Sequence, residues 1–288
     1  MDKFKVLLYY KYAPLDADEK FRKAHLKLCV GLGLKGRVLI ADEGLNGTLA
    51  GSPEAVDTYM EETSKIKGLE DIEWKISWAH EQIFPRMRVV LRPEIVTLGL
   101  RQKMTDVDLD NKAHYIEPEE LLALYEEETD FVILDARNEY EAKIGKFKNA
   151  LIPPIDNFRD FPKFVQKNLA DYKDKPVVTY CTGGIRCEKA SAYLREQGFT
   201  DVRQLHGGIH VYGEKTGGKH FEGEMFVFDK RLSIPVNNVN PTVVSSCEHC
   251  GTKITRYIDC AKREKCKGLF VCCEECDEKY NSLCSQCN

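Results

Sequence analysis

The 288-residue chain has no hydrophobic run of the length that a membrane-spanning helix needs, about 20 residues. Its N-terminus offers one apolar stretch, residues 6–10, which is shorter than the core of a secretory signal peptide, and no small-residue cleavage site follows it. These absences argue against a membrane protein and against a secreted one. We therefore expect a cytoplasmic protein without a membrane partner, and the sequence leaves its oligomeric state open.

An excess of one charge sign is also missing, since 46 acidic residues balance the 42 basic residues. Bulk charge gives no support for nucleic-acid binding, which must depend on a local basic patch. The best basic stretch contains five cations: Arg86, Arg88, Arg92, Arg101 and Lys103. Three aromatic residues precede or border it: Trp74, Trp78 and Phe84. This pattern suits phosphate binding and base stacking, and a solvated surface over core tryptophans would produce it equally well.

Cysteine is scarce in most of the chain and dense at its end. Of the 12 cysteines, only Cys29, Cys181 and Cys187 precede residue 247. Because a cytosolic protein keeps its thiols reduced, the terminal cluster indicates metal binding before disulfides. We recognise no flavin or nicotinamide fingerprint, by which we mean a Gly-x-Gly-x-x-Gly turn between a strand and a helix.

The chain divides into three predicted segments, residues 1–103, 113–225 and 226–288. The first has a β-α-β-β-α-β order of elements, which is typical of the ferredoxin-like α+β fold. The second alternates short buried strands with helices, which predicts a mainly parallel α/β sheet. In such sheets the functional site lies at the carboxyl ends of the strands, where the sequence places Asp135 and Cys181. The third segment has too few aliphatic residues for an ordinary core.

The most informative stretch begins at Cys181, which leaves a strand and is followed by two glycines, an arginine and a helix. Glycines allow backbone N–H groups to turn inward around an anion, and a helix N-terminus adds partial positive charge. This setting should stabilise the thiolate of Cys181. Cys181 and Arg186 are thus the candidate catalytic residues, and four residues between them form the candidate anion cradle: Thr182, Gly183, Gly184 and Ile185.

This loop, the Asp135-x-Arg137 motif and the Leu205–Ile209 turn together resemble the rhodanese domain, in which the cysteine matched by Cys181 carries a persulfide. The Cys-x4-Arg spacing is the rhodanese type, whereas tyrosine phosphatases use Cys-x5-Arg. Cys187 either resolves an oxidised Cys181 by forming a disulfide or fills the first helical turn. Asp135 and Arg137 are expected to orient loops at the sheet end.

The whole chain resembles a narrower family, the rhodanese-related tRNA uridine hydroxylases. The resemblance is carried by residues 42–51, by residues 181–191 and by the cysteine-rich tail. It implies an oxidoreductase that uses molecular oxygen to form 5-hydroxyuridine at the wobble position of tRNA and requires Cys181. The alternative is a sulfurtransferase that passes persulfide sulfur to a small molecule or a protein acceptor.

The cysteine-rich tail contains three Cys-x2-Cys pairs, the spacing with which one knuckle supplies two sulfurs to a tetrahedral ion. Eight thiolates would fill two closed structural zinc sites, with either Cys272 or Cys273 left over. A cross-braced arrangement gives one set of Cys247, Cys250, Cys273 and Cys276. The other set is then Cys260, Cys266, Cys284 and Cys287. An unbraced pairing and an iron–sulfur cluster are the alternatives.

Overall fold

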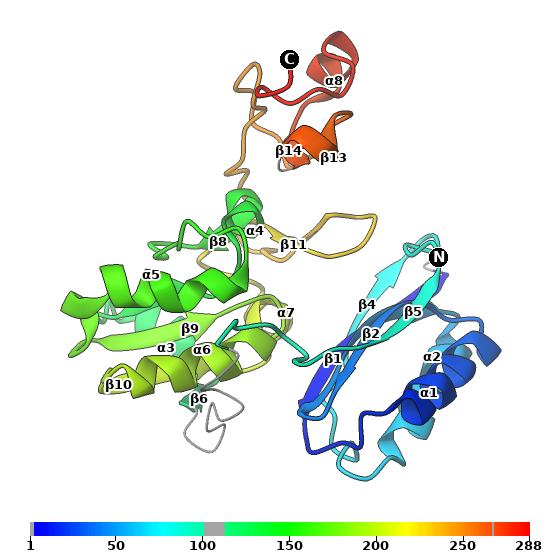
Figure 1. The fold of residues 1–288 in the computed structure, drawn as a ribbon. Helices are drawn as coiled ribbons and strands as arrows, with labels where there is room; N and C mark the ends of the chain where they lie inside the picture. Colours follow the sequence, from blue (N-terminus) through cyan, green and yellow to red (C-terminus); the bar gives the residue numbers. More distant parts are fainter. Residues whose placement is uncertain (1–2, 101–112, 267) are drawn as a thin grey trace. The chain divides into compact units, whose positions relative to one another are not determined.

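The computed structural model describes residues 3–100, 113–266 and 268–288 (Figure 1), so the predicted RNA-binding residues Arg101 and Lys103 lie outside the described residues. The chain forms two compact units, Met1–Thr97 and Leu98–Asn288. The second unit contains both the predicted α/β segment and the cysteine-rich segment. Their division near residue 226 remains a prediction.

The first unit is a five-stranded sheet with both helices on one face (Figure 1). Its elements are β1 Phe4–Tyr12, α1 Glu19–Gly31, β2 Lys35–Ala41, β3 Gly44–Gly51, α2 Pro53–Ser64, β4 Lys75–Ala79 and β5 Met87–Leu91. The strand order is β4-β1-β3-β2-β5. The predicted ferredoxin-like arrangement is confirmed, with β5 added parallel to β2 at the sheet edge.

Both helices of this unit begin at a residue whose side chain caps the first turn. The Asp18 carboxylate accepts a hydrogen bond from the Phe21 N–H at 2.7 Å, and the Ser52 hydroxyl accepts one from the Ala55 N–H at 3.2 Å. Such caps satisfy N–H groups that have no partner inside the helix. The helices then bury Cys29 and Val56 against the sheet, where burial raises the pKa of the Cys29 thiol to about 12. Cys29 is therefore a packing residue.

The Gly-x-Gly-x-x-Gly spacing does occur in this unit, at Gly31, Gly33 and Gly36. It connects the end of α1 to the start of β2. A dinucleotide site needs the reverse order, because the pyrophosphate binds at the N-terminus of the helix that follows the glycines. The three glycines here connect a helix to a strand, so they do not form a dinucleotide-binding turn.

The second unit contains a parallel sheet of order β6-β10-β9-β7, a small sheet of order β12-β11-β8 and the hairpin β13-β14. Its strands are β6 His114–Ile116, β7 Val132–Asp135, β8 Gly145–Phe147, β9 Pro176–Tyr180, β10 Asp201–Leu205, β11 Phe221–Phe226, β12 Ser233–Pro235, β13 Tyr257–Asp259 and β14 Leu269–Val271. Its helices are α3 Pro118–Glu126, α4 Glu139–Ile144, α5 Phe161–Asn168, α6 Ile185–Glu196, α7 Gly208–Thr216 and α8 Glu274–Lys279, with short 3-10 turns at Phe158–Asp160, Ala170–Tyr172 and Arg263–Lys265.

The parallel register brings the predicted site residues together. Strand β7 pairs with β9 so that Asp135 lies opposite Tyr180, the residue before Cys181. Both strand ends therefore lie at the carboxyl edge of the sheet, over a core that includes Ile133, Val178 and Leu205. This confirms the predicted α/β class. Within the described residues, no helix is long and apolar enough to cross a membrane.

Candidate functional site

The loop after β9 encloses the sulfur of Cys181. Gly184 has a φ of 101°, which an L side chain rarely adopts, and its N–H donates a hydrogen bond to Cys181 Sγ at 3.1 Å. Helix α6 begins at the next residue. The thiol thus lies in the predicted cradle of inward-pointing N–H groups at a helix N-terminus.

The start of α7 fixes this loop from the other side. The N–H of Ile209 donates to the carbonyl of Cys181 at 3.0 Å, and the N–H of His210 donates to that of Thr182 at 3.1 Å. Gly208 has a φ of 64°, and a Cβ there would lie 2.5 Å from the Cys181 carbonyl oxygen. A side chain at this position would therefore displace the loop, a constraint that the sequence showed only as a glycine turn.

The environment of Cys181 favours the thiolate. Burial by itself raises the pKa of this thiol, but a hydrogen bond from Cys187, the charge of Arg186 and backbone N–H groups outweigh burial and lower the pKa to about 5. Burial and the neighbouring Cys181 thiolate raise the pKa of Cys187, which therefore stays protonated and can donate. The charge of Arg186 and the backbone N–H groups thus favour the thiolate at Cys181, whereas burial favours the neutral thiol at Cys187.

Arg186 is held by a residue that the sequence reasoning did not single out. Its guanidinium donates two hydrogen bonds to the buried carboxylate of Glu141, at 2.5 and 2.8 Å. Glu141 lies in the first turn of α4, where it also accepts from the Asn138 N–H at 3.1 Å. The Asn138-x-x-Glu141 spacing is a capping box, which was the available signal for a fixed carboxylate here.

Asp135 and Arg137 form a second buried ion pair beside the loop. Arg137 Nη2 donates to Asp135 Oδ2 at 2.7 Å and to the Gly145 carbonyl at 2.8 Å, and the Tyr180 hydroxyl donates to the same carboxylate at 2.6 Å. Every charged atom of the pair is thus engaged within the protein. Through Tyr180 the pair connects the ends of β7 and β9, and its role in orienting loops remains a prediction.

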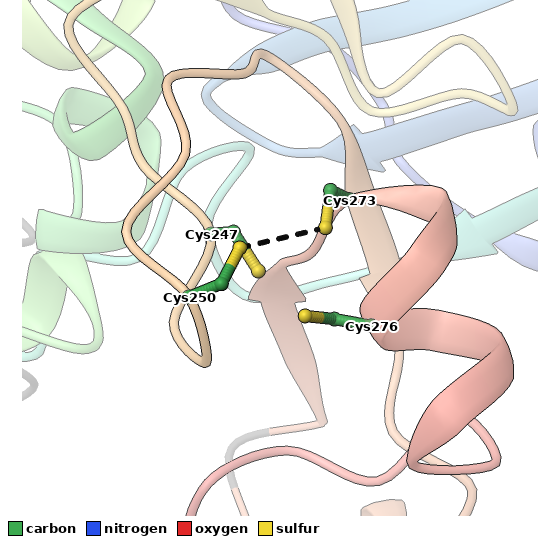
Figure 2. Close-up of side chains that lie close together, drawn as sticks. All are labelled: Cys247, Cys250, Cys273 and Cys276. Atoms are coloured by element: carbon green, nitrogen blue, oxygen red, sulfur yellow. Dashed lines mark hydrogen bonds between the residues drawn. The ribbon is translucent and has the colours of Figure 1, made fainter.

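The eight predicted metal-binding cysteines gather in the two sets of the cross-braced pairing. In each set the four sulfur atoms all lie within 4.8 Å of one another. Figure 2 shows the sulfurs of one set pointing toward a common centre, with Cys250 Sγ and Cys273 Sγ 3.7 Å apart. A tetrahedral ion with metal–sulfur bonds of about 2.3 Å requires a sulfur–sulfur separation of about 3.8 Å. Cys272 is the cysteine left outside both sets.

Three family models match successive parts of the chain. The family model described as UPF0176 acylphosphatase like domain matches residues 4–95, the Rhodanese-like domain model matches residues 117–215, and the Rhodanase C-terminal model matches residues 222–288. Among solved structures, a rhodanese-like domain protein from Staphylococcus aureus is 27% identical and covers 36% of this chain and 94% of its own, with a TM-score of 0.30.

Curated relatives match over nearly the full length. A Listeria welshimeri protein named tRNA uridine(34) hydroxylase is 45% identical over 288 residues, which cover 99% of this chain and 89% of that protein. A Streptococcus sanguinis protein of the same name is 44% identical over 287 residues, covering 98% of this chain and 87% of that protein. The resemblance stated from the sequence is thereby confirmed.

The hydrogen bond between the two buried cysteines gives the first prediction. Replacing Cys187→Ala removes a donor to the thiolate and should raise the pKa of Cys181 by about 1–2 units, since a hydrogen bond to a charged group contributes about 1.5–3 kcal/mol. The alkylation rate of Cys181, followed by mass spectrometry from pH 4 to 9, measures the shift. Cys187→Ser keeps a donor and should retain the low midpoint; a midpoint near pH 5 in the alanine variant would contradict the assignment.

The second prediction concerns the buried Arg186–Glu141 pair. Glu141→Gln leaves the guanidinium without its charge partner and should lower the free energy of unfolding by about 3 kcal/mol or more. Urea denaturation measures the loss. Glu139→Gln, in the same helical turn and without an ion pair to any described residue, is the control and should change stability by about 0.5 kcal/mol or less. Equal stabilities of the two variants would show that the pair contributes nothing.

Proposed function

The chain belongs to the tRNA uridine(34) hydroxylase family, and on this premise we propose that it hydroxylates uridine 34 of tRNA to 5-hydroxyuridine, with Cys181 as the reacting group. The observation that carries the proposal is the loop that encloses Cys181 Sγ, where the Gly184 N–H donates to the sulfur at 3.1 Å, in a chain that a named relative matches over 99% of its length. The enzyme is accordingly an oxidoreductase whose partner is tRNA.

The chemistry assigned to Cys181 is transient nucleophilic addition. Attack of its sulfur on the uracil ring forms a carbon–sulfur bond and leaves an electron pair on the ring, and later elimination restores the thiolate. One atom of molecular oxygen replaces the C5 hydrogen as a hydroxyl group. The other atom leaves as water, with two electrons and two protons from a thiol reductant that becomes a disulfide.

Access to the sulfur favours a persulfide form of the nucleophile. Cys181 is fully buried, at 0% exposure. A persulfide would place the reacting sulfur about 2 Å beyond Sγ, the length of a sulfur–sulfur bond. The same cradle would stabilise the persulfide anion, which is also why a sulfurtransferase acting on a small molecule or protein is the second candidate.

The tail contributes structure rather than chemistry in this proposal. Each cysteine set supplies four sulfur ligands, which suits a closed zinc site with no position for substrate. Two zinc ions would cross-link a segment that has few aliphatic residues. Metal–thiolate bonds would then replace a hydrophobic core as the source of folding free energy.

The function is tested in a strain that lacks the gene. Wild-type protein should restore 5-hydroxyuridine derivatives at position 34, measured by mass spectrometry of nucleosides, with an oxygen-18 label after growth under labelled oxygen. Cys181→Ala should lower the product by about 10²-fold or more. Cys29→Ala, in the core of the other unit, is the control. Unchanged nucleosides in the deletion strain, with sulfur transfer to cyanide intact, would favour the sulfurtransferase.

The metal assignment is tested by elemental analysis of adjacent variants. Wild-type protein should contain two zinc ions per chain and no visible absorbance. Cys273→Ala should lose one ion, because it removes a ligand of the first set, whereas Cys272→Ala should keep both. Iron with absorbance in the visible range would overturn zinc, and equal metal content in the two variants would overturn the ligand assignment.

A further inference from the structure

The sheet of the first unit has one face without helices, which we call the open face. Residues of β1 and β2 that contact α1 and α2 alternate with residues that point the other way, as in any strand. Tyr9 and Val38 belong to the helix-covered core, so Tyr10 and Arg37 lie on the open face. Residues 83 and 84 cover one end of it, packed on Val6.

Strand register places two cations side by side at one edge of the open face, where β5 pairs with β2. Arg37 of β2 lies opposite Arg88 of β5 on one side and opposite Thr48 of β3 on the other. Adjacent strands are about 4.8 Å apart, so the two arginines are immediate neighbours although 51 positions separate their numbers. Both side chains are exposed.

In the part of the chain that the structure describes, no carboxylate pairs with these arginines. Among the described residues, neither Arg37, Arg88 nor Arg92 forms an ion pair, and the strand residues on the open face include no Asp or Glu. Partial burial and then the charges of Arg92 and Arg88 lower the pKa of Arg37. These like charges repel one another in the free protein. A bound polyanion would reduce that repulsion.

Aromatic rings lie beside this basic row. Tyr10 occupies the next row of the open face, opposite Asn46 of β3, and its ring contacts that of Tyr12 at a centroid distance of 6.1 Å. The Lys75 ammonium lies 5.2 Å from the centre of the Tyr10 ring. RNA-recognition modules built on a four-stranded sheet bind single-stranded RNA by stacking bases on aromatic side chains of the sheet, and basic side chains along such a surface contact phosphates.

The aromatic residues proposed from the sequence lie elsewhere. Trp74 packs beneath the helices, 4.9 Å from the ring of Tyr9, and Phe84 is buried in the small cluster with Val6. Trp78 lies on the edge strand β4 opposite Lys5, on the helix side. The side-chain amide of Asn46 donates to the Ile95 carbonyl at 2.9 Å.

We infer that the open face of the first unit binds single-stranded RNA, with Arg37, Arg88 and Arg92 on phosphates and Tyr10 beside the bases. The inference rests on the proposed function and specifies it: position 34 lies in the single-stranded anticodon loop of tRNA. It assigns substrate capture to the first unit and chemistry to the Cys181 loop of the second. It also supplies a local basic patch in a chain with little net charge, because Arg37 and Arg88 are neighbours on this face.

The test compares two double charge reversals in the full chain. Arg37→Glu/Arg88→Glu should weaken binding of a labelled anticodon stem–loop RNA by about 10-fold or more, by fluorescence anisotropy. The slope of log K against log salt should become shallower by about 1.4, the value for two lost single-strand phosphate contacts. Lys20→Glu/Lys27→Glu changes the same charge on exposed positions of α1 and should bind like wild type. Circular dichroism confirms that each variant is folded.

Equal RNA affinity of the two double variants would overturn the inference. If the open-face variant keeps RNA affinity but loses compactness in small-angle X-ray scattering, the face instead docks on the second unit. The proposed function is tested separately from this inference. If the wild-type protein restores 5-hydroxyuridine but the open-face variant binds RNA normally, the inference fails and the proposed function stands. Unchanged nucleosides in the deletion strain remove the function whatever the binding result.

Discussion

A negative charge on a buried sulfur is the constraint on which the second unit depends. A thiolate removed from water is stable only where positive groups converge on it. Here the convergence comes from the N–H of Gly184, the thiol of Cys187 and the charge of Arg186. Each of these groups has its position because a parallel strand ends where a helix begins. The low pKa of the thiol therefore depends on the topology of the sheet.

The positive charge near that sulfur is itself buried and has to be held. Glu141 binds Arg186 through both carboxylate oxygens, and α4 carries this carboxylate. The tail in turn packs on α4: the Tyr257 hydroxyl donates to the Tyr140 carbonyl at 2.6 Å, and the same ring joins Ile144 in a small core. Continuous contacts therefore lead from the cysteine-rich tail to the reactive loop, which gives the tail a physical role in supporting the site.

The two units differ in how their charged side chains are paired. In the second unit, buried charges are paired one by one at short distance, as for Arg137 with Asp135. In the first unit, Arg37 and Arg88 are exposed neighbours, and neither forms an ion pair with a described residue. The paired charges of the second unit hold the side chains of the site in place. The exposed arginines of the first unit leave a positive potential that a ligand can use. A near-neutral total charge conceals both, since composition carries no information on which residues share a surface.

The sequence by itself determined the features that are local in the chain. The Cys181–Arg186 loop, the helix caps and the Cys-x2-Cys knuckles are each defined within a few residues, because turn and cap geometry depends on neighbours. Tertiary structure alone decided the contacts between distant residues. Glu141 contacts Arg186 across 45 positions, Arg37 lies beside Arg88 through strand register, and the eight cysteines sort into two sets only when the tail folds. Alternation along β4 likewise put Trp78 on the face opposite the arginines, since a shift of one residue in a strand exchanges its two faces.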